Sequence, residues 1–250
     1  LAAAAFNLKD PSLYEITWVN TPTHSDVGVA FNGTTQYGDM GFAPSTLFSA
    51  VTDGTIGGAF DHSGSGTDYI MGVTQATDQR FFMFYNSGNL DTQLFKTGAS
   101  KTSFSYTTRN RQFTTTRRGD TDIESYEDGV SKATETTSQS TASLPTINPF
   151  VGAYNNAGTP AGYSALTVSS LFAGNGLTDN QVTDLYDAVT KYNQTVLVGA
   201  LDADALSFIE DAGITNRTEI ENINNLVLNL KGTGVTTNDT DLWSDMNAIY

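Results

Sequence analysis

The sequence contains no cysteine and only two histidines, His24 and His62, which stand far apart in the chain. Disulfide bonds and thiolate metal sites are therefore excluded, and a histidine-based metal or proton-transfer site is not expected. No apolar run approaches the roughly 20 residues that a membrane-spanning helix needs, so membrane insertion is not expected. Lysine and arginine number 12 against 27 aspartates and glutamates, and this net charge of −15 argues against nucleic acid as a partner.

The few basic residues gather once, in a segment that contains Arg109, Arg111, Arg117 and Arg118. Such a segment could form an anion-binding patch or the solvated face of a strand, and we favour the strand face. The chain begins at Leu1 rather than at methionine, which predicts a processed or partial chain. Whether the run Ala2 to Ala5 represents true residues is left open by the sequence.

Residues 6 to about 173 are rich in threonine, serine, glycine and asparagine, and carry short apolar stretches between turn signals. Residues 27–31 predict a strand that leads into a hairpin-type turn at Asn32-Gly33. Residues 80–85 predict a strand buried on both faces or nearly so, and Asp128-Gly129 predicts a tight turn. Further strands are expected at 104–106, 123–126, 130–136, 149–154 and 164–173. Many short strands of this kind predict an antiparallel β-sandwich.

Helical periodicity begins after the predicted strands. Thr178 to Gln181 fits a capping box, and the following apolar residues fall on one helix face, which predicts a helix near 178–193. Further short helices are expected from about 202 to 212, from 216 to 230 and from 239 onwards. The third of these four helices carries an apolar stripe that we expect to mediate self-association, formed by Ile220, Ile223, Val227 and Leu230.

Several passages resemble a known family. Residues 31–39, Phe-Asn-Gly-Thr-Thr-Gln-Tyr-Gly-Asp, resemble the F-N-G-T-x-x-Y-x-D signature of laminin-G-like, concanavalin-A-like jelly-roll domains. Residues 126–130 resemble the Y-x-N/D-G-x hairpin of that fold. Residues 150–154, 170–179 and 185–192 resemble its closing strands and helix as they occur in structural proteins of bacteriophages that infect Bacteroidetes-type bacteria. The resemblance implies a mainly β sandwich with a small C-terminal α-helical module.

The two ends of the chain extend this resemblance. Residues 201–215 are similar to the start of the helical module in these phage proteins, and residues 242–250 to its W-x-x-M-x-A-I-Y end. Residues 6–11 are similar to the F-N-L-K-D-P segment that follows such a module. We therefore expect a sandwich over 1–196, a helical linker or docking module over 197–250, and a chain that is a fragment or repeat unit of a longer protein.

The functional expectation follows from the same resemblance. It implies a non-enzymatic virion structural protein, namely a capsid-surface, fibre or tail component on the particle surface, whose partners are other virion proteins and copies of itself. The alternative is a carbohydrate-binding adhesin domain that recognises host-surface glycans, assisted by calcium. We expect no catalytic residues and no cofactor, with calcium as the one exception to be tested.

Two motifs bear on these alternatives. Glucanases of the concanavalin-A-like fold place acids at E-x-D-x-E spacing on one strand face, and Asp120, Asp122 and Glu124 fit this spacing superficially. A structural role is favoured because the first acid is aspartate and neither tryptophan, Trp18 or Trp243, lies nearby in sequence. A hydrolase would require activity to be lost when Asp122 or Glu124 is changed.

The alternatives also involve a loop and an aromatic strand. Asp61 and Asp68 flank a Gly/Ser loop, where laminin-G-like modules sometimes hold calcium through carboxylate and backbone oxygens. Their spacing matches no regular calcium loop, so an ordinary turn is favoured. The aromatic residues at 81, 82, 84 and 85 could form a sugar-stacking platform, although core packing is favoured for them.

Overall fold

The computed structural model describes residues 13–25, 27–62, 67–76, 79–96, 101–106, 111–138 and 143–197, together with positions 205, 206, 209, 223, 224 and 227. By its contacts the chain divides into two compact units, Leu1–Tyr186 and Asp187–Tyr250. The domain boundary between 196 and 197, expected from the sequence, stays a prediction. In the described ranges, no helix is long and apolar enough to cross a membrane.

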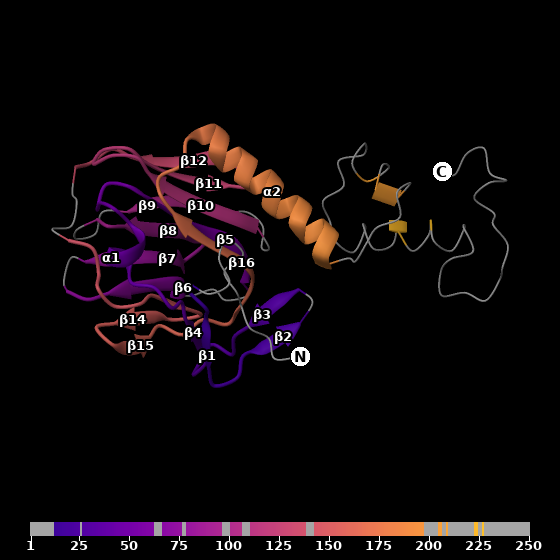
Figure 1. Cartoon of the computed structure of the whole chain (residues 1–250), viewed down its shortest axis with the longest axis horizontal. Helices are drawn as coiled ribbons and strands as arrows, with labels where there is room; N and C mark the ends of the chain where they lie inside the picture. The colour runs from indigo at the N-terminus through magenta and orange to yellow at the C-terminus, as the bar shows by residue number, and fades with distance from the viewer. Residues whose placement is uncertain are drawn as a thin grey trace. The chain divides into compact units, whose positions relative to one another are not determined.

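Two β-sheets pack face to face in the first unit (Figure 1). The nine-stranded sheet has the order β1-β4-β13-β6-β7-β8-β9, with β14 and β15 beside β6. Its strands are β1 (Thr17–Val19), β4 (Tyr37–Asp39), β6 (Thr67–Thr74), β7 (Arg80–Asn86), β8 (Asn89–Leu94), β9 (Thr102–Ser105), β13 (Phe150–Val151), β14 (Tyr154–Asn156) and β15 (Thr159–Ala161). The β14–β6 pair is parallel, and the other pairs between these strands are antiparallel.

The seven-stranded sheet has the order β12-β11-β10-β5-β16-β3-β2. Its strands are β2 (Thr23–Ser25), β3 (Gly28–Ala30), β5 (Gly54–His62), β10 (Arg111–Arg117), β11 (Ile123–Glu127), β12 (Val130–Glu135) and β16 (Leu166–Gly174). All its neighbouring strands run antiparallel. The antiparallel β-sandwich expected from the sequence is therefore confirmed.

The two turns expected from the sequence have different outcomes. Asp128 and Gly129 both adopt positive φ, 50° and 74°, and join β11 to β12 as a two-residue hairpin, as predicted. Gly33 also has positive φ, but β3 and β4 on either side of it belong to different sheets, so the hairpin prediction at Asn32-Gly33 was wrong. The reason lies in the Asn32 side chain. Its Oδ1 accepts hydrogen bonds from the next backbone amides, which folds the loop onto itself as the chain crosses between sheets.

Strand alternation divides the aromatic segment between the inner and outer faces of the nine-stranded sheet. Phe81, Met83 and Tyr85 of β7 point between the sheets and are at most 1% exposed. Phe82 and Phe84 lie on the opposite face of the same strand, which is the outer face of the nine-stranded sheet. The expected burial on both faces or nearly so is confirmed, because Phe82 on the outer face is 5% exposed and Phe84 beside it is half-buried. This outer pair also takes part in the groove described below.

A buried hydroxyl network links the two sheets through the core. Thr115 of β10 donates to Thr92 of β8 at 3.1 Å and lies 2.7 Å from the Ser125 hydroxyl. Ser125 in turn lies 2.6 Å from the Thr102 hydroxyl of β9. These four side chains are at most 3% exposed, and each hydroxyl finds a partner in the others. The abundance of threonine is therefore partly a property of the interior rather than of exposed loops.

Helices flank the sandwich at α1 (Pro44–Leu47) and α2 (Asp179–Leu197). The predicted capping box starts α2: the Thr178 amide donates to Gln181 Oε1 at 2.9 Å, and the Gln181 amide donates to Thr178 Oγ1 at 3.4 Å. Val182 is fully buried on the inner face of this helix. The helix prediction for 178–193 is confirmed.

Positions 205, 206, 209, 223, 224 and 227 of the second unit are helical. Val227 is 5% exposed and Ile223 is half-buried. Ile220 and Leu230, the other two members of the apolar stripe, lie outside the described residues. Self-association through this stripe stays a prediction.

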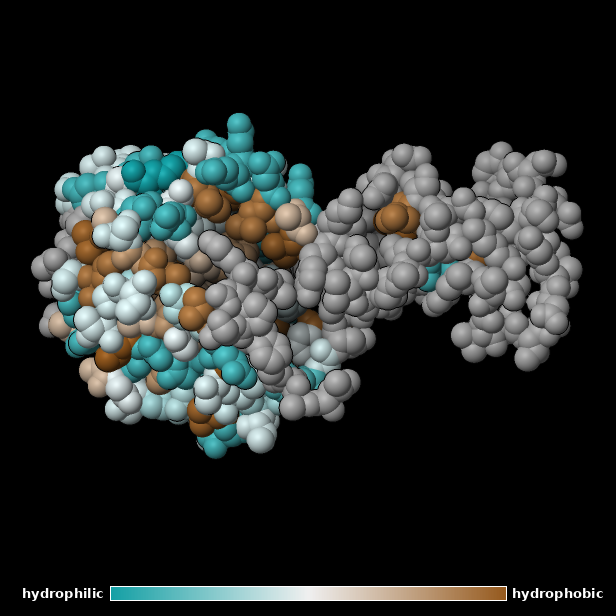
Figure 2. All heavy atoms as spheres, in the orientation of Figure 1, coloured by the Kyte–Doolittle hydropathy of each residue, from teal (hydrophilic) through white to brown (hydrophobic). Residues whose placement is uncertain are grey.

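The surface of the sandwich is mixed in character. Figure 2 shows hydrophobic residues at several points among polar ones on the face in view. Single exposed apolar residues such as Val27 and Val130 are normal for a folded protein. A functional site must therefore be argued from a concave region with a defined set of groups.

Candidate functional site

An open groove of about 580 Å³ lies on the outer face of the nine-stranded sheet. Its residues come from β6, β7, β8 and β14, from the turn after β6 and from the residue before β9. Strand alternation places the even-numbered side chains of β7 on this face, because the odd-numbered ones fill the core. The groove is therefore built on paired strands rather than on loops.

A row of aromatic rings crosses the groove. The row consists of Tyr154, Tyr69 and Phe84. The Tyr69 ring is the middle one, and its centroid lies 4.3 Å from that of Tyr154 and 5.1 Å from that of Phe84. Phe82 lies deeper, edge-on to both Tyr69 and Tyr154 at 5.4 and 5.3 Å. Gly72 leaves the space for it, since a Cβ there would lie 2.2 Å from Cδ1 of Phe82. The row joins the consecutive strands β6 and β7 to β14, which is distant in sequence but pairs with β6 in the sheet.

The polar side of the groove extends from Arg80 to Lys101. Arg80 Nη1 donates to Gln93 Oε1 at 3.5 Å across the β7–β8 pair. Lys101 Nζ lies 5.9 Å from the centroid of the Phe84 ring and forms an ion pair with Asp91. The Asp91 carboxylate is fully buried and also accepts hydrogen bonds from Asn86 and Ser103. This arrangement holds Lys101 at the end of the aromatic row.

The remaining wall is fixed by hydrogen bonds from side chains to backbone groups and to one another. Gln75 Oε1 accepts from the Thr146 amide at 2.6 Å, while Gln75 Nε2 donates to Thr146 Oγ1 at 2.8 Å. Asn155 Nδ2 donates to the Asn148 carbonyl at 2.7 Å, which holds the start of the β14–β15 hairpin. These contacts position the neighbouring groove residues before any ligand arrives, and such preorganisation reduces the entropy that binding costs.

The groups in the groove fit a polyhydroxylated ligand. Aromatic carbons can pack against the C–H groups of a sugar ring, while amide and guanidinium groups exchange hydrogen bonds with hydroxyls. Burial, followed by the neighbouring Tyr154, raises the pKa of Tyr69 above its ordinary value. The Tyr69 hydroxyl therefore stays protonated at neutral pH and can donate a hydrogen bond.

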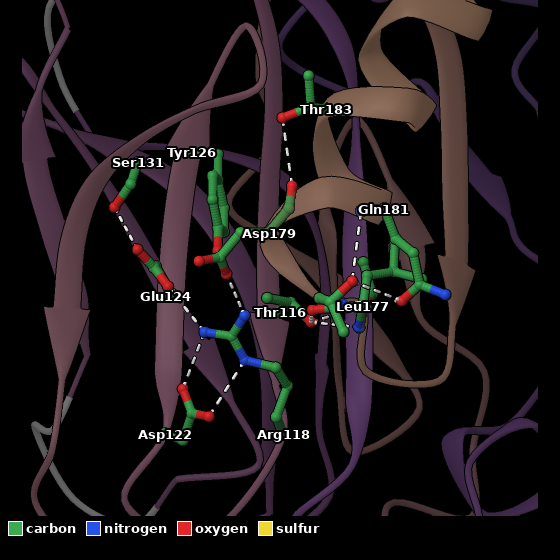
Figure 3. A network of polar contacts seen from close by, with 12 residues as sticks. Thr116, Arg118, Asp122, Glu124, Tyr126, Ser131, Leu177, Asp179, Gln181 and Thr183 are labelled. Carbon is green, nitrogen blue, oxygen red and sulfur yellow. Dashed lines mark hydrogen bonds and ion pairs between the residues drawn. The ribbon is translucent and has the colours of Figure 1, made fainter.

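The acids at 120, 122 and 124 lie elsewhere: Glu124 is in β11 of the seven-stranded sheet, Asp120 and Asp122 are in the turn before it, and each contacts an arginine. Figure 3 shows the Arg118 guanidinium between the carboxylates of Asp122, Glu124 and Asp179. Arg118 contacts both oxygens of Asp122, through Nε at 3.1 Å and Nη2 at 3.0 Å, and Glu124 at 2.7 Å. Asp120 contacts Arg117 instead. Each of these carboxylates is thus paired with an arginine, and the structural role that the sequence favours for them stays a prediction.

The arginine segment differs from the solvated strand face that we favoured. Arg117 is fully buried, and its guanidinium donates to backbone carbonyls of Leu94, Phe95, Gly119 and Asp120 at 2.6–3.4 Å. The polar sequence of the strand gave no sign of this, because two of the acceptors are carbonyls at the end of β8, which the sheet packing brings to Arg117. Arg111 does match the expectation, since it is 41% exposed and pairs with Asp128. Arg109 lies outside the described residues.

Asp179 connects the arginine network to helix α2. As the first residue of the helix, it accepts a hydrogen bond from Tyr126 Oη at 2.8 Å and forms an ion pair with Arg118. The hydrogen bond from Arg118, and then the one from Tyr126, lower the pKa of Asp179 below its ordinary value of 3.8. A negative charge at a helix N-terminus is also stabilised by the helix dipole.

We expect Asp179→Asn to lower the stability of the sandwich by on the order of 1 kcal/mol at pH 7, because it removes one exposed ion pair and one N-terminal charge. Since the folded-state pKa is depressed, this contribution is complete above the ordinary carboxyl pKa and is lost as the pH falls through the depressed value. Urea unfolding of both proteins from pH 7 to pH 2 measures the difference. Asp184→Asn, in the same helix, controls for net charge. A difference that persists at pH 2 would contradict this account.

The two candidate calcium ligands are in different environments. Asp68 Oδ2 lies 2.7 Å from Nε2 of His62, which is 2% exposed and stacks on Tyr85 with centroids 4.2 Å apart. Asp61 is exposed. Residues 63–66 between them lie outside the described ranges, and within those ranges no group of three metal-ligating side chains comes together. Calcium at Asp61 and Asp68 stays a prediction.

The sequence indicated only part of the groove: it offered the aromatic residues of β7 as a possible platform but favoured core packing, which holds for the buried Phe82 and less for the half-buried Phe84. The available signal was the alternation within residues 80–86. Arg80 and Asn86, the polar residues at the two ends, fall on the same strand face as Phe82 and Phe84, which indicates that this face reaches solvent. Tyr154 and Lys101 could not have been added from the sequence, because strand order brings them to this face.

No family model matches the sequence, and no curated protein matches it. Several solved structures, however, are similar to this chain. A mutant of Trypanosoma rangeli sialidase that displays trans-sialidase activity matches with a TM-score of 0.52 at 19% identity, over 69% of this chain and 29% of that chain. Trypanosoma rangeli sialidase in complex with sialic acid matches with a TM-score of 0.51 at 17% identity, also over 69% of this chain and 29% of that chain. A mutant of HCR/D matches with a TM-score of 0.52 at 10% identity, over 71% of this chain and 47% of that chain.

This comparison corrects one prediction. Sialidases are enzymes, so their similarity contradicts the expectation that the chain is not an enzyme. The chain spans less than one third of the sialidases and about half of HCR/D. At these identities the similarity establishes the fold alone. The chain therefore shares a β-sandwich with part of a sialidase and with HCR/D.

Proposed function

We propose that the chain is a carbohydrate-binding β-sandwich domain and that the groove on the nine-stranded sheet is its binding site. The observation that carries this proposal is the aromatic row Tyr154–Tyr69–Phe84, which is bordered by amide and cationic side chains on paired strands. Aromatic rings next to hydrogen-bonding groups supply the two kinds of contact that a sugar ring needs. The groove is open along the sheet, which suits part of an extended chain of sugars.

The comparison with solved structures supports this proposal indirectly. One of the matching sialidases is in complex with sialic acid, so a protein that contains this sandwich binds a sugar. The identity is too low to transfer a site, and the groove residues are therefore argued from this chain alone.

The biological setting is a separate proposal. On the resemblance of residues 31–39, 126–130 and 150–154 to phage structural proteins, we propose that the domain is displayed on a virion surface as a capsid, fibre or tail component. Its partners would then be other virion proteins, copies of itself and host-surface glycans. Peptides of this chain in purified phage particles, found by mass spectrometry, would support the setting; their consistent absence from particles of a phage that encodes the chain would oppose it.

The binding proposal is tested on a panel of immobilised glycans that includes neutral and acidic oligosaccharides. We expect saturable binding to a subset of the panel, competed by the same oligosaccharide in solution. Addition of a chelator tests the calcium prediction in the same experiment, because a calcium-assisted site would lose binding. Absence of saturable binding across bacterial surface polysaccharides and the panel would contradict the proposal.

A further inference from the structure

The charge of the groove is opposite to that of the chain. The protein carries a net charge of −15, and 27 of its residues are acidic. Even so, the charged side chains among the described groove residues are Arg80 and Lys101, which are both positive. The described groove residues include no aspartate or glutamate. Acidic residues are more than twice as numerous as basic ones, so this is a local reversal of sign on an acidic surface.

The negative charge of Asp91, which pairs with Lys101, is not accessible to a ligand in the groove. The Asp91 side chain lies on the same outer face as Phe84, its partner in the β7–β8 register, but it is fully buried, whereas that of Lys101 is 32% exposed. The carboxylate is also shared among Lys101, Asn86 and Ser103, which leaves it oriented toward protein donors. A ligand in the groove would therefore meet the ammonium group, while the buried carboxylate fixes its position.

Arg80 and Lys101 border the aromatic row from different strands. Arg80 begins β7 and is held by Gln93, while Lys101 lies over Phe84 next to the start of β9. A sugar packed against the rings would lie within reach of cationic groups on its periphery. Guanidinium groups bind carboxylates with two parallel hydrogen bonds, which adds geometric selection to charge.

Resting on the proposed carbohydrate function, we infer that the groove is selective for glycans that carry carboxylates, such as uronic or nonulosonic acids. The aromatic row contacts the sugar ring, Arg80 binds the carboxylate, and Lys101 adds a second positive charge. The acidic remainder of the surface repels polyanions in general, so the selectivity arises at the groove and not from overall charge.

The test uses matched pairs of probes. Oligogalacturonates and oligosialic acids are compared with their carboxyl-reduced forms, in which each carboxylate has become a hydroxymethyl group. We expect the reduced forms to bind at least ~10-fold more weakly, in line with the loss of a charge-assisted hydrogen bond. Arg80→Gln is expected to abolish this difference, whereas Arg111→Gln on the other sheet is expected to preserve it. Thermal unfolding verifies that each variant is folded.

The outcomes separate this inference from the function on which it rests. Equal affinity for acidic and reduced probes would overturn the inference and leave carbohydrate binding in place. A preference for acidic probes that survives Arg80→Gln and Lys101→Gln would also overturn it, because the selectivity would then lie elsewhere. Failure of both probe types, together with failure of the wider neutral panel, would overturn both proposals.

Discussion

Tyr69→Ala is expected to weaken glycan binding by at least ~30-fold, the largest effect that we predict for a single groove residue. Tyr69 is the middle ring of the row, with centroids 4.3 Å from Tyr154 and 5.1 Å from Phe84. Its removal deletes the central contact surface and lets both neighbours move. Aromatic anchors at the centre of an interface typically account for 2 kcal/mol or more, which is the basis of this figure.

Two further variants make the result specific. Tyr69→Phe keeps the ring and removes the hydroxyl, so a smaller loss of about 3- to 10-fold is expected. Tyr186→Ala removes a tyrosine from helix α2, which packs near Gly129 of the other sheet, and should leave binding unchanged. Isothermal titration with the tightest oligosaccharide of the panel measures all three. Equal effects of Tyr69→Ala and Tyr186→Ala would exclude the groove as the site.

Arg117→Met is expected to lower the free energy of unfolding by about 3–5 kcal/mol, because it removes the donor for several buried carbonyls at once. The Arg117 side chain is fully buried and donates to the carbonyls of Leu94, which ends β8, and of the following Phe95, and to the turn that begins at Gly119. It thus joins the two sheets at one end of the sandwich. Methionine fills much of the volume but leaves the carbonyl oxygens without a partner.

Arg111→Met, on the same strand, is the matched control. The Arg111 side chain is 41% exposed and its ion pair with Asp128 is partly solvated, so a change below ~1 kcal/mol is expected. Urea unfolding followed by circular dichroism measures both variants. A loss below 1 kcal/mol for Arg117→Met would show that the buried guanidinium is not a main support of the sandwich.

The fold was predictable because its signals are local. The Asp128-Gly129 dipeptide has one favourable hairpin geometry, and Thr178 to Gln181 forms the reciprocal hydrogen bonds that its residue types allow. Short alternating segments such as 123–126 could be placed as strands for the same reason. Asn32-Gly33 shows the limit, since a turn was predicted correctly but its partner strands lie in different sheets.

The groove could be predicted only in part because it depends on strand order. An unbroken aromatic run does not reveal which face of a strand is covered, so the sequence favours the core for both outer residues, whereas in the structure Phe82 is buried and Phe84 is half-buried. Tyr69, Lys101 and Tyr154 join them through non-local pairing that no local pattern specifies. The prediction for Arg117 failed in the opposite direction. An arginine in a polar strand is usually solvated, whereas Arg117 is buried and donates to carbonyls at the end of β8 in the other sheet.

The most direct test of the central claim is an NMR titration of the isotope-labelled chain with the tightest oligosaccharide of the panel. Our account predicts saturable amide shifts concentrated in β6, β7 and β14, with Tyr69, Phe84 and Tyr154 among the most affected residues, and loss of these shifts in Tyr69→Ala. Saturable shifts confined to the seven-stranded sheet or to the Asp61–Asp68 region would contradict it, because the glycan would then bind outside the groove.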